Sequence, residues 1–312
     1  MDRLTENKII LVVRDTRLDD LVARFNTQEQ ARFYIEHLGA DFSDYQSEDR
    51  TYKAAVHEAE TILSRLGRLQ TLHRAYVTNF IFGEEDTVVV LGQDGLVANV
   101  LKYLTHQVVL GVNPDPQRWE GVLLPFTLGQ LDTALREVFH RKRTIRQVTM
   151  AKVSLNTGES LNGVNDLFIG PRTHTSARYT IRVGDRAEEH SSSGIIVSTG
   201  LGSTGWFRSV LAGATGIATA ATGRLMKWAK DPAFPWDADY LYFSVREPWP
   251  SKTSSAGITF GKITSQTPLE LLSHMPGHGV IVSDGIEADF LQFNSGTSAT
   301  ISLSEKRGHL AV

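Results

Sequence analysis

The sequence predicts an α/β protein with two domains: an N-terminal open parallel α/β sheet domain and a second, mostly antiparallel β domain. Up to about residue 142, short apolar runs alternate with segments whose apolar residues recur at helical spacing. This alternation is typical of a parallel sheet with right-handed crossovers. Further on, short strand-like runs separated by Gly, Pro and Ser dominate, as in antiparallel sheets. We place the first domain at 1–142 and the second at 143–290, followed by a C-terminal tail at 291–312. One option is that this tail returns to the first domain.

The N-terminal domain is expected to contain three strands, each a short and mostly apolar run. The run Thr87–Leu91 is rich in β-branched residues, which indicates a strand buried on both faces. The predicted strands are 8–13, 87–91 and 108–112.

Helices are expected between these strands. The apolar residues of 18–25 keep helical spacing, and Thr27 with Gln30 has the pattern of a capping box for a second helix. The clearest helix runs from about Ser47 to Leu66, and Gly67 stands where a C′ glycine belongs. A helix also follows each of the strands 87–91 and 108–112, and the second of these helices begins at Thr127.

The second domain shows strand patterns interrupted by one helical stretch. This stretch runs from Trp206 to about Ala229 and is rich in Ala, Gly and Thr. The predicted strands are 179–183, 241–245, 257–263, 279–283 and 299–303.

The composition is that of a soluble globular protein, with 41% hydrophobic and 21% charged residues and a net charge of −3. This charge gives no reason to expect a nucleic-acid or membrane partner. No run approaches the roughly 18 apolar residues that span a bilayer, and the N-terminus has no signal-peptide pattern. The absence of cysteine excludes disulfides, thiolate nucleophiles and cysteine-ligated metal sites. We therefore predict a cytoplasmic protein.

The most informative motif is the step from the strand 87–91 into Gly92-Gln93-Asp94-Gly95. The carboxyl end of a buried parallel strand is where open α/β sheets bind ligands. Glycine amides and a helix N-terminus can hold phosphate oxygens, and a carboxylate can accept a proton from an attacking hydroxyl. The motif predicts phosphate chemistry on a nucleotide, although the same four residues also suit an ordinary turn.

Two further motifs lie in the second domain. The segment 200–205 fits G-x-G-x-x-G, but no acidic residue follows at the spacing of a dinucleotide fingerprint, and Trp206 replaces the lysine of a P-loop. It remains a candidate loop whose backbone approaches a ligand. Asn165-Asp166 precedes the apolar run 167–169 and is either a structural turn or a pair that hydrogen-bonds a base or ribose.

In this order, the motifs resemble the NAD kinase family, and the resemblance covers nearly the whole chain. Further motifs resemble the divergent branch that includes the mitochondrial-type NAD kinases. The segments that carry both resemblances are Gly92–Leu96, Asn165-Asp166, Thr199–Trp206, Arg14–Arg17, Gly111–Pro116, Glu120-Gly121, Ser192–Gly194, Phe243–Pro248 and Val282–Gly285.

The resemblance implies an NAD kinase-like fold and an NAD kinase that makes NADP with ATP or another phosphate donor. Asp94 would then be the base for the adenosine ribose 2′-hydroxyl of NAD, with Mg²⁺ bound to the donor rather than to protein ligands. The family also implies a homodimer or homotetramer. The residues assigned to the phosphates are Gly92, Gln93 and Gly95, and those assigned to NAD are Asn165, Asp166, Ser193, Thr204, Gly205, Trp206 and Ser209.

Three positions depart from the family pattern. Gln93 stands where the phosphate turn has a glycine, Leu96 where it has a threonine, and Asp166 where the usual residue is Glu. These departures keep two alternatives open: a nucleotide-binding protein without catalysis, and a kinase for another hydroxyl, such as that of a sugar or a lipid headgroup. The sequence does not distinguish NAD from NADH as the substrate, or ATP from other nucleotides and polyphosphate as the phosphate donor.

Overall fold

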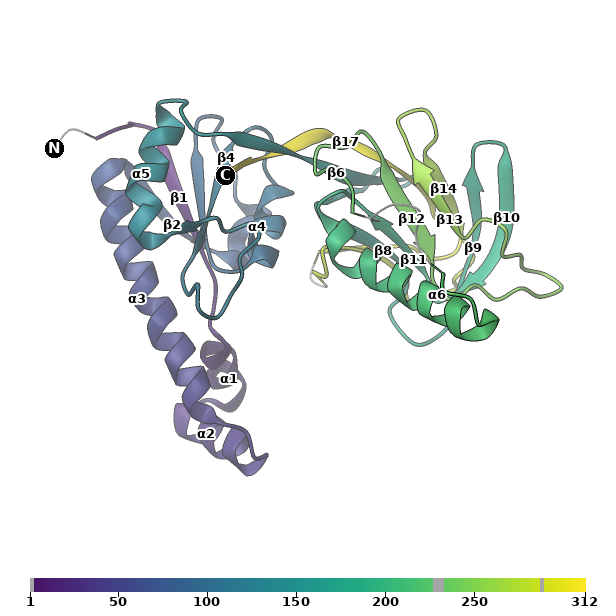
Figure 1. Ribbon diagram of the computed structural model, residues 1–312, viewed down its shortest axis with the longest axis horizontal. Coiled ribbons are helices and arrows are strands. Elements are labelled where there is room, and N and C mark those ends of the chain that lie inside the picture. Colours follow the sequence, from purple (N-terminus) through teal and green to yellow (C-terminus); the bar gives the residue numbers. More distant parts are fainter. Residues whose placement is uncertain (1–2, 227–232, 287–288) are drawn as a thin grey trace. The chain divides into compact units, whose positions relative to one another are not determined.

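A computed structural model describes residues 3–226, 233–286 and 289–312 (Figure 1). The chain divides into two compact units, the first made of the residues up to Arg146 with His309–Val312, and the second of Gln147–Gly308. A parallel sheet in the first unit and antiparallel sheets in the second confirm the predicted fold class. None of the helices within the described ranges is long and apolar enough to cross a membrane.

The first unit is a parallel sheet flanked by helices. Its strands β2, β1, β3 and β4 lie side by side in that order, and the last residues of β17 pair with β4. The strands are β1 (Lys8–Val13), β2 (Arg68–His73), β3 (Thr87–Leu91), β4 (Val108–Asn113) and β5 (Phe126–Thr127). The helices are α1 (Arg17–Phe25), α2 (Gln28–His37), α3 (Phe42–Leu66), α4 (Asp94–Leu101) and α5 (Leu128–Phe139), with the 3₁₀ helix η1 (Arg74–Asn79).

Burial explains why these residues form these elements. All five residues of β3 are buried, as expected for a central strand. α3 and α5 cover one face of the sheet and α4 the other (Figure 1), and α3 places Tyr52, Ala59 and Leu63 in the core beneath it. The predicted strands 8–13 and 87–91 have the bounds of β1 and β3.

Two predictions about the long helix are wrong. α3 begins at Phe42, five residues before the predicted start, because Asp41 caps it by accepting the Ser43 backbone N–H. Gly67 is not a left-handed cap, since its φ is −165°. It packs closely against β1, since a Cβ there would lie 2.8 Å from Ile9 Cδ1 and would have to displace that side chain.

The second unit is built from two antiparallel sheets that enclose an apolar core. One sheet has the order β13-β12-β11-β8-β15-β16, and the other joins β10, β9, β14 and β17, with β6 paired to β17 and β7. The strands are β6 (Ile145–Leu155), β7 (Ser160–Gly163), β8 (Asp166–Pro171), β9 (Ala177–Val183), β10 (Arg186–Ser192), β11 (Ile195–Ser198), β12 (Leu241–Val245), β13 (Phe260–Ile263), β14 (Leu269–Ser273), β15 (Gly279–Ser283), β16 (Phe290–Gln292) and β17 (Ser298–Ala311).

One helix, α6 (Trp206–Thr222), follows the short 3₁₀ helix η2 (Gly202–Thr204). α6 lies against β11 and buries Phe207, whose ring stacks on that of Tyr242. The helix ends at Thr222 and is capped by Gly223, which is left-handed (φ 67°). The predicted end near Ala229 lies outside the described residues.

Candidate functional site

The phosphate-turn motif lies where β3 ends and α4 begins. Gln93 is the N-cap residue and makes no capping hydrogen bond with its side chain, while Asp94 is the first residue of α4. The Asp94 carboxylate accepts the backbone N–H groups of Leu123 at 2.8 Å and Val122 at 3.2 Å. A carboxylate has about four lone-pair sites, so two remain for a ligand hydroxyl. The Asp94 side chain is therefore oriented but not saturated.

The loop that holds Asp94 is itself fixed by β4. A Cβ on Gly111 would lie 1.9 Å from the Leu123 carbonyl oxygen, so only glycine permits the loop to pass this close. Gly121 is left-handed with φ 67°, and the Asn113 amide donates to the Trp119 carbonyl at 2.8 Å. The segments 111–116 and 120–121 therefore place the two backbone donors at the Asp94 carboxylate.

Gly92 lies beneath two side chains. A Cβ on Gly92 would lie 2.9 Å from Leu96 Cδ2 and 3.8 Å from Arg14 Nε. The Arg14 side chain is 7% exposed, stacks on the Tyr52 ring and pairs with Glu48 at 3.0 Å. Leu96 thus covers the turn where the family resemblance places phosphate, and Gly95 is exposed beside it.

In the second unit, the segment after β11 packs directly onto the residues before β8. A Cβ on Gly202 would lie 2.0 Å from the Asn165 carbonyl oxygen. The Thr199 hydroxyl donates to the Val164 carbonyl at 2.5 Å and accepts the Gly202 N–H at 3.2 Å. The G-x-G-x-x-G segment is therefore a loop that packs onto Val164 and Asn165, rather than a dinucleotide-binding βαβ turn.

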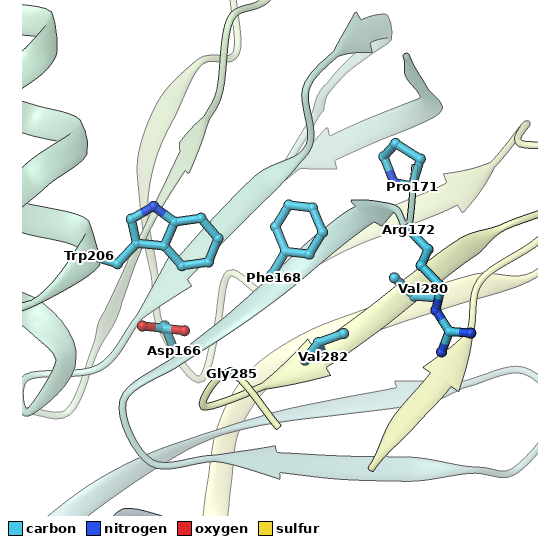
Figure 2. A pocket seen from close by; sticks show the side chains of 8 residues that line it. All are labelled: Asp166, Phe168, Pro171, Arg172, Trp206, Val280, Val282 and Gly285. Carbon is cyan, nitrogen blue, oxygen red and sulfur yellow. The ribbon is translucent and has the colours of Figure 1, made fainter. Parts of the chain in front are cut away.

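A cavity of about 220 Å³ opens beside these residues (Figure 2). Asp166 lies near Trp206 at one end of it, and Arg172 lies at the other. The rings of Phe168 and Trp206 stack with centroids 5.8 Å apart, and Trp206 is 40% exposed. The residues that line the cavity are Asp166, Phe168, Pro171, Arg172, Trp206, Val280, Val282 and Gly285.

The carboxyl group of Asp166 has unusual electrostatics. Burial, and then the negative charge of Asp284, raise its pKa to about 7. Asp284 is left-handed (φ 54°) and accepts the backbone N–H groups of Asn165 at 2.6 Å and Val164 at 3.0 Å. Asp166 can therefore act near neutral pH as a hydrogen-bond donor or as an acceptor.

The other predicted residues of this unit do not line the cavity. Thr204 and Gly205 are exposed just before α6, and Ser209 is exposed one turn into it, with its hydroxyl 3.5 Å from the Gly205 carbonyl. Ser193 is exposed on the turn between β10 and β11, and its backbone N–H donates to the Arg246 carbonyl at 2.9 Å. Of the predicted dinucleotide residues, only Asp166 and Trp206 line the cavity.

Sequence reasoning did not single out several lining residues. Phe168 lies in the apolar run 167–169, which by itself indicates only a strand. Arg172 follows a Gly-Pro pair at the end of β8. The available signal was position: Arg172 lies just past a strand end, and Phe168 faces away from the neighbours that are buried in the core. Within the described part of the chain, no group of three or more His, Asp or Glu side chains could hold a metal ion.

No protein-family model matches the sequence, and no curated protein matches it either. Solved structures do match. An NAD kinase from Archaeoglobus fulgidus, in complex with ATP, has a TM-score of 0.58 and 16% identity, over 97% of this chain and 92% of that one. A yeast NADH kinase complexed with NADH has a TM-score of 0.58 and 14% identity, over 99% of this chain and 84% of that one. The chain therefore has the NAD kinase fold.

Proposed function

We propose that this protein is an NAD(H) kinase, which transfers a phosphoryl group from ATP or another donor to the adenosine ribose 2′-hydroxyl. The observation that carries the proposal is the carboxylate of Asp94 at the end of the buried strand β3, oriented by two backbone N–H groups. The fold shared with kinases of NAD and NADH supports the same reaction. The matching motifs also lead us to propose the divergent, mitochondrial-type branch.

In the proposed reaction, the ribose 2′-oxygen attacks the terminal phosphorus while its proton moves to Asp94. A new O–P bond forms, and the bond between that phosphorus and the donor's bridging oxygen breaks, which releases ADP when the donor is ATP. Gly92, Gln93 and Gly95 would lie along the phosphates. Mg²⁺ would be held by the donor phosphates, whose charge it would neutralise.

The dinucleotide is assigned to the second unit. Asn165 and Asp166 would provide polar groups for ribose hydroxyls, and Trp206, which is exposed, would provide an aromatic face for stacking. The exposed residues Ser193, Thr204, Gly205 and Ser209 would line the remainder of the groove. We further propose a homodimer or homotetramer, which light scattering of the purified protein would test.

The test is a product assay for NADP and NADPH with ATP, other nucleoside triphosphates and polyphosphate as donors. We expect turnover with at least one donor, and a loss of about 10²-fold or more in kcat for Asp94→Asn, the size typical of a missing general base. Asp132→Asn on the exposed face of α5 is the matched control and should retain full activity. Absence of product with every donor, or full activity of a folded Asp94→Asn variant, would refute the mechanism.

A second candidate is a nucleotide-binding protein without phosphoryl transfer. Leu96, in contact distance of the Gly92 turn, favours it, as does the side chain of Gln93 at the N-cap. This candidate predicts that calorimetry detects binding of NAD or ATP while no product forms. Gln93→Gly with Leu96→Thr should then create activity, whereas unchanged activity would show that these two residues do not block the turn. A hydroxyl-substrate screen with labelled donor would reveal a kinase for a sugar or lipid.

A further inference from the structure

A groove of about 610 Å³ runs along the helix α6 of the second unit (Figure 1). Part of its wall is a row of residues spaced by four, which therefore lie along one side of the helix. This row consists of Arg208, Ala212, Gly216 and Ala220. Leu225 and Met226, which follow the helix, line the groove as well. Its volume falls in the range of small-molecule sites. Of the residues assigned above to NAD or to phosphate, all within the described chain, none lines it.

The groove is mostly apolar, although two threonines line it. The Thr215 hydroxyl donates to the Leu211 carbonyl at 2.8 Å, and the Thr219 hydroxyl accepts the Met226 backbone N–H at 3.1 Å. Both hydroxyl groups are thus engaged with the backbone and offer a ligand little further hydrogen bonding. Leu225 is 72% exposed and Met226 47% exposed. Apolar surface that gathers around a hollow in this way is typical of a binding site.

Gly216 leaves space in the middle of the groove. A Cβ on this residue would meet no atom within 4 Å, so packing within the described chain does not require glycine there. Glycine destabilises a helix interior relative to alanine. A ligand that lies against α6 gives the missing side chain a reason, because it can approach the backbone closely at this point.

Charge is confined to one end of the groove. Among the described residues that line it, Arg208 alone is charged, and the sequence has no Asp or Glu from residue 190 to residue 226. The Arg208 side chain is exposed and makes no ion pair with any residue that the structure describes. A guanidinium group is a strong partner for a carboxylate. The groove therefore suits a ligand with an anionic head and an apolar tail.

We propose that this groove binds a fatty acid, with the carboxylate at Arg208 and the alkyl chain along α6 towards Ala220. The two residues are 12 positions apart, which at the helical rise corresponds to about 18 Å. An extended alkyl chain of medium length covers this distance, and burial of its methylene groups supplies the affinity. The inference goes beyond the proposed kinase activity and does not depend on it.

The test measures the binding of laurate and octanoate, each below its micelle concentration, by calorimetry. We expect laurate to bind about tenfold more tightly or better, because its longer chain buries more methylene groups. Gly216→Leu fills the groove and should weaken laurate binding by about tenfold or more. Gly213→Leu is the matched control and should leave it within about twofold. Gly213 is also exposed on α6 with no atom within 4 Å of its Cβ position, but it does not line the groove.

A second pair of variants tests the charged end of the groove. Arg208→Gln should weaken laurate binding by about three- to fivefold, the size of an exposed ion pair. Arg224→Gln, just beyond the end of α6 and outside the groove lining, should leave laurate binding unchanged. Thermal denaturation checks that each variant is folded.

The inference is overturned if laurate binds no more tightly than octanoate, or if Gly216→Leu and Gly213→Leu affect its binding equally. It is also overturned if no monomeric laurate binds and Gly216→Leu alone dissociates an oligomer in light scattering, since the groove would then be an interface between copies of the chain. Binding to phosphatidylglycerol vesicles without binding of monomeric laurate would refute it as well, in favour of a membrane surface. NADP formation enters none of these readouts, so the inference and the proposed function fail separately.

Discussion

Replacing Asp166 by Asn should stabilise the protein, and the gain should depend on pH. Burial and the neighbouring charge of Asp284 raise the pKa of Asp166 from 3.8 to about 7 in the folded state. Within the described residues, no hydrogen bond stabilises the ionised Asp166 side chain. The backbone N–H of Asp166 is 3.3 Å from the Asp284 carboxylate. Ionised Asp166 therefore lowers the free energy of unfolding, and an uncharged amide of the same shape removes this destabilisation.

The sign follows from proton linkage. Below pH 3.8 the carboxyl is protonated in both states and costs nothing. Between pH 3.8 and 7 the unfolded chain ionises first, so the wild-type protein loses stability as pH rises, and above pH 7 the full cost remains. At about 1.36 kcal/mol per pKa unit, the shift amounts to about 4 kcal/mol at pH 8 and about 1.5 kcal/mol at pH 5. These are upper values, because the side chain is only partly buried.

Urea denaturation of Asp166→Asn and wild-type protein at both pH values measures the difference. We expect the advantage of the variant to grow by about 2 kcal/mol between pH 5 and pH 8. Asp185→Asn, on the exposed turn after β9, is the control and should show no such trend. An advantage that is equal at the two pH values would refute the reasoning, as would a variant less stable than wild type at pH 8.

Two further predictions concern packing and buried charge. Gly202→Ala places a Cβ 2.0 Å from the Asn165 carbonyl and should cost about 3 kcal/mol or more, whereas Gly205→Ala meets its nearest neighbour at 3.5 Å and should cost under about 1 kcal/mol; thermal denaturation compares them. Glu48→Gln removes the charged partner of the buried Arg14 guanidinium and should cost about 3 kcal/mol in urea, while Asp132→Asn, in an exposed pair, should unfold like wild type. Equal unfolding free energies within either pair would contradict the corresponding argument.

The strands that the sequence predicts best are short apolar runs that are mostly buried. β3, β12 and β15 are of this kind, and each has its predicted bounds. The polar strands β2 and β10 escape prediction, because they contain few apolar residues and only pairing with a neighbour makes them strands. Apolar periodicity reports burial, so it says little about a strand at the edge of a sheet.

The candidate sites show the same limit at the level of single residues. Asp166 and Trp206 can be selected from local motifs, but the charge that perturbs Asp166 comes from Asp284, 118 positions further along the chain. A second cavity, between α3 and the loop after β4, is lined by both Thr51 and Gln117. Nothing in either segment alone indicates that these two residues lie close together. Motifs identify candidate groups, whereas the fold decides which charges and walls surround them.

The glycine turn illustrates how the two levels combine. From the sequence, Asp94 is a carboxylate at a strand end, a position that an ordinary turn also explains. In the structure, its orientation depends on the loop at Leu123, and that loop reaches it only because Gly111 has no side chain. A carboxylate that only began a helix would not need a glycine in the neighbouring strand β4. The pairing of Asp94 with this loop therefore supports the role that we propose for the turn.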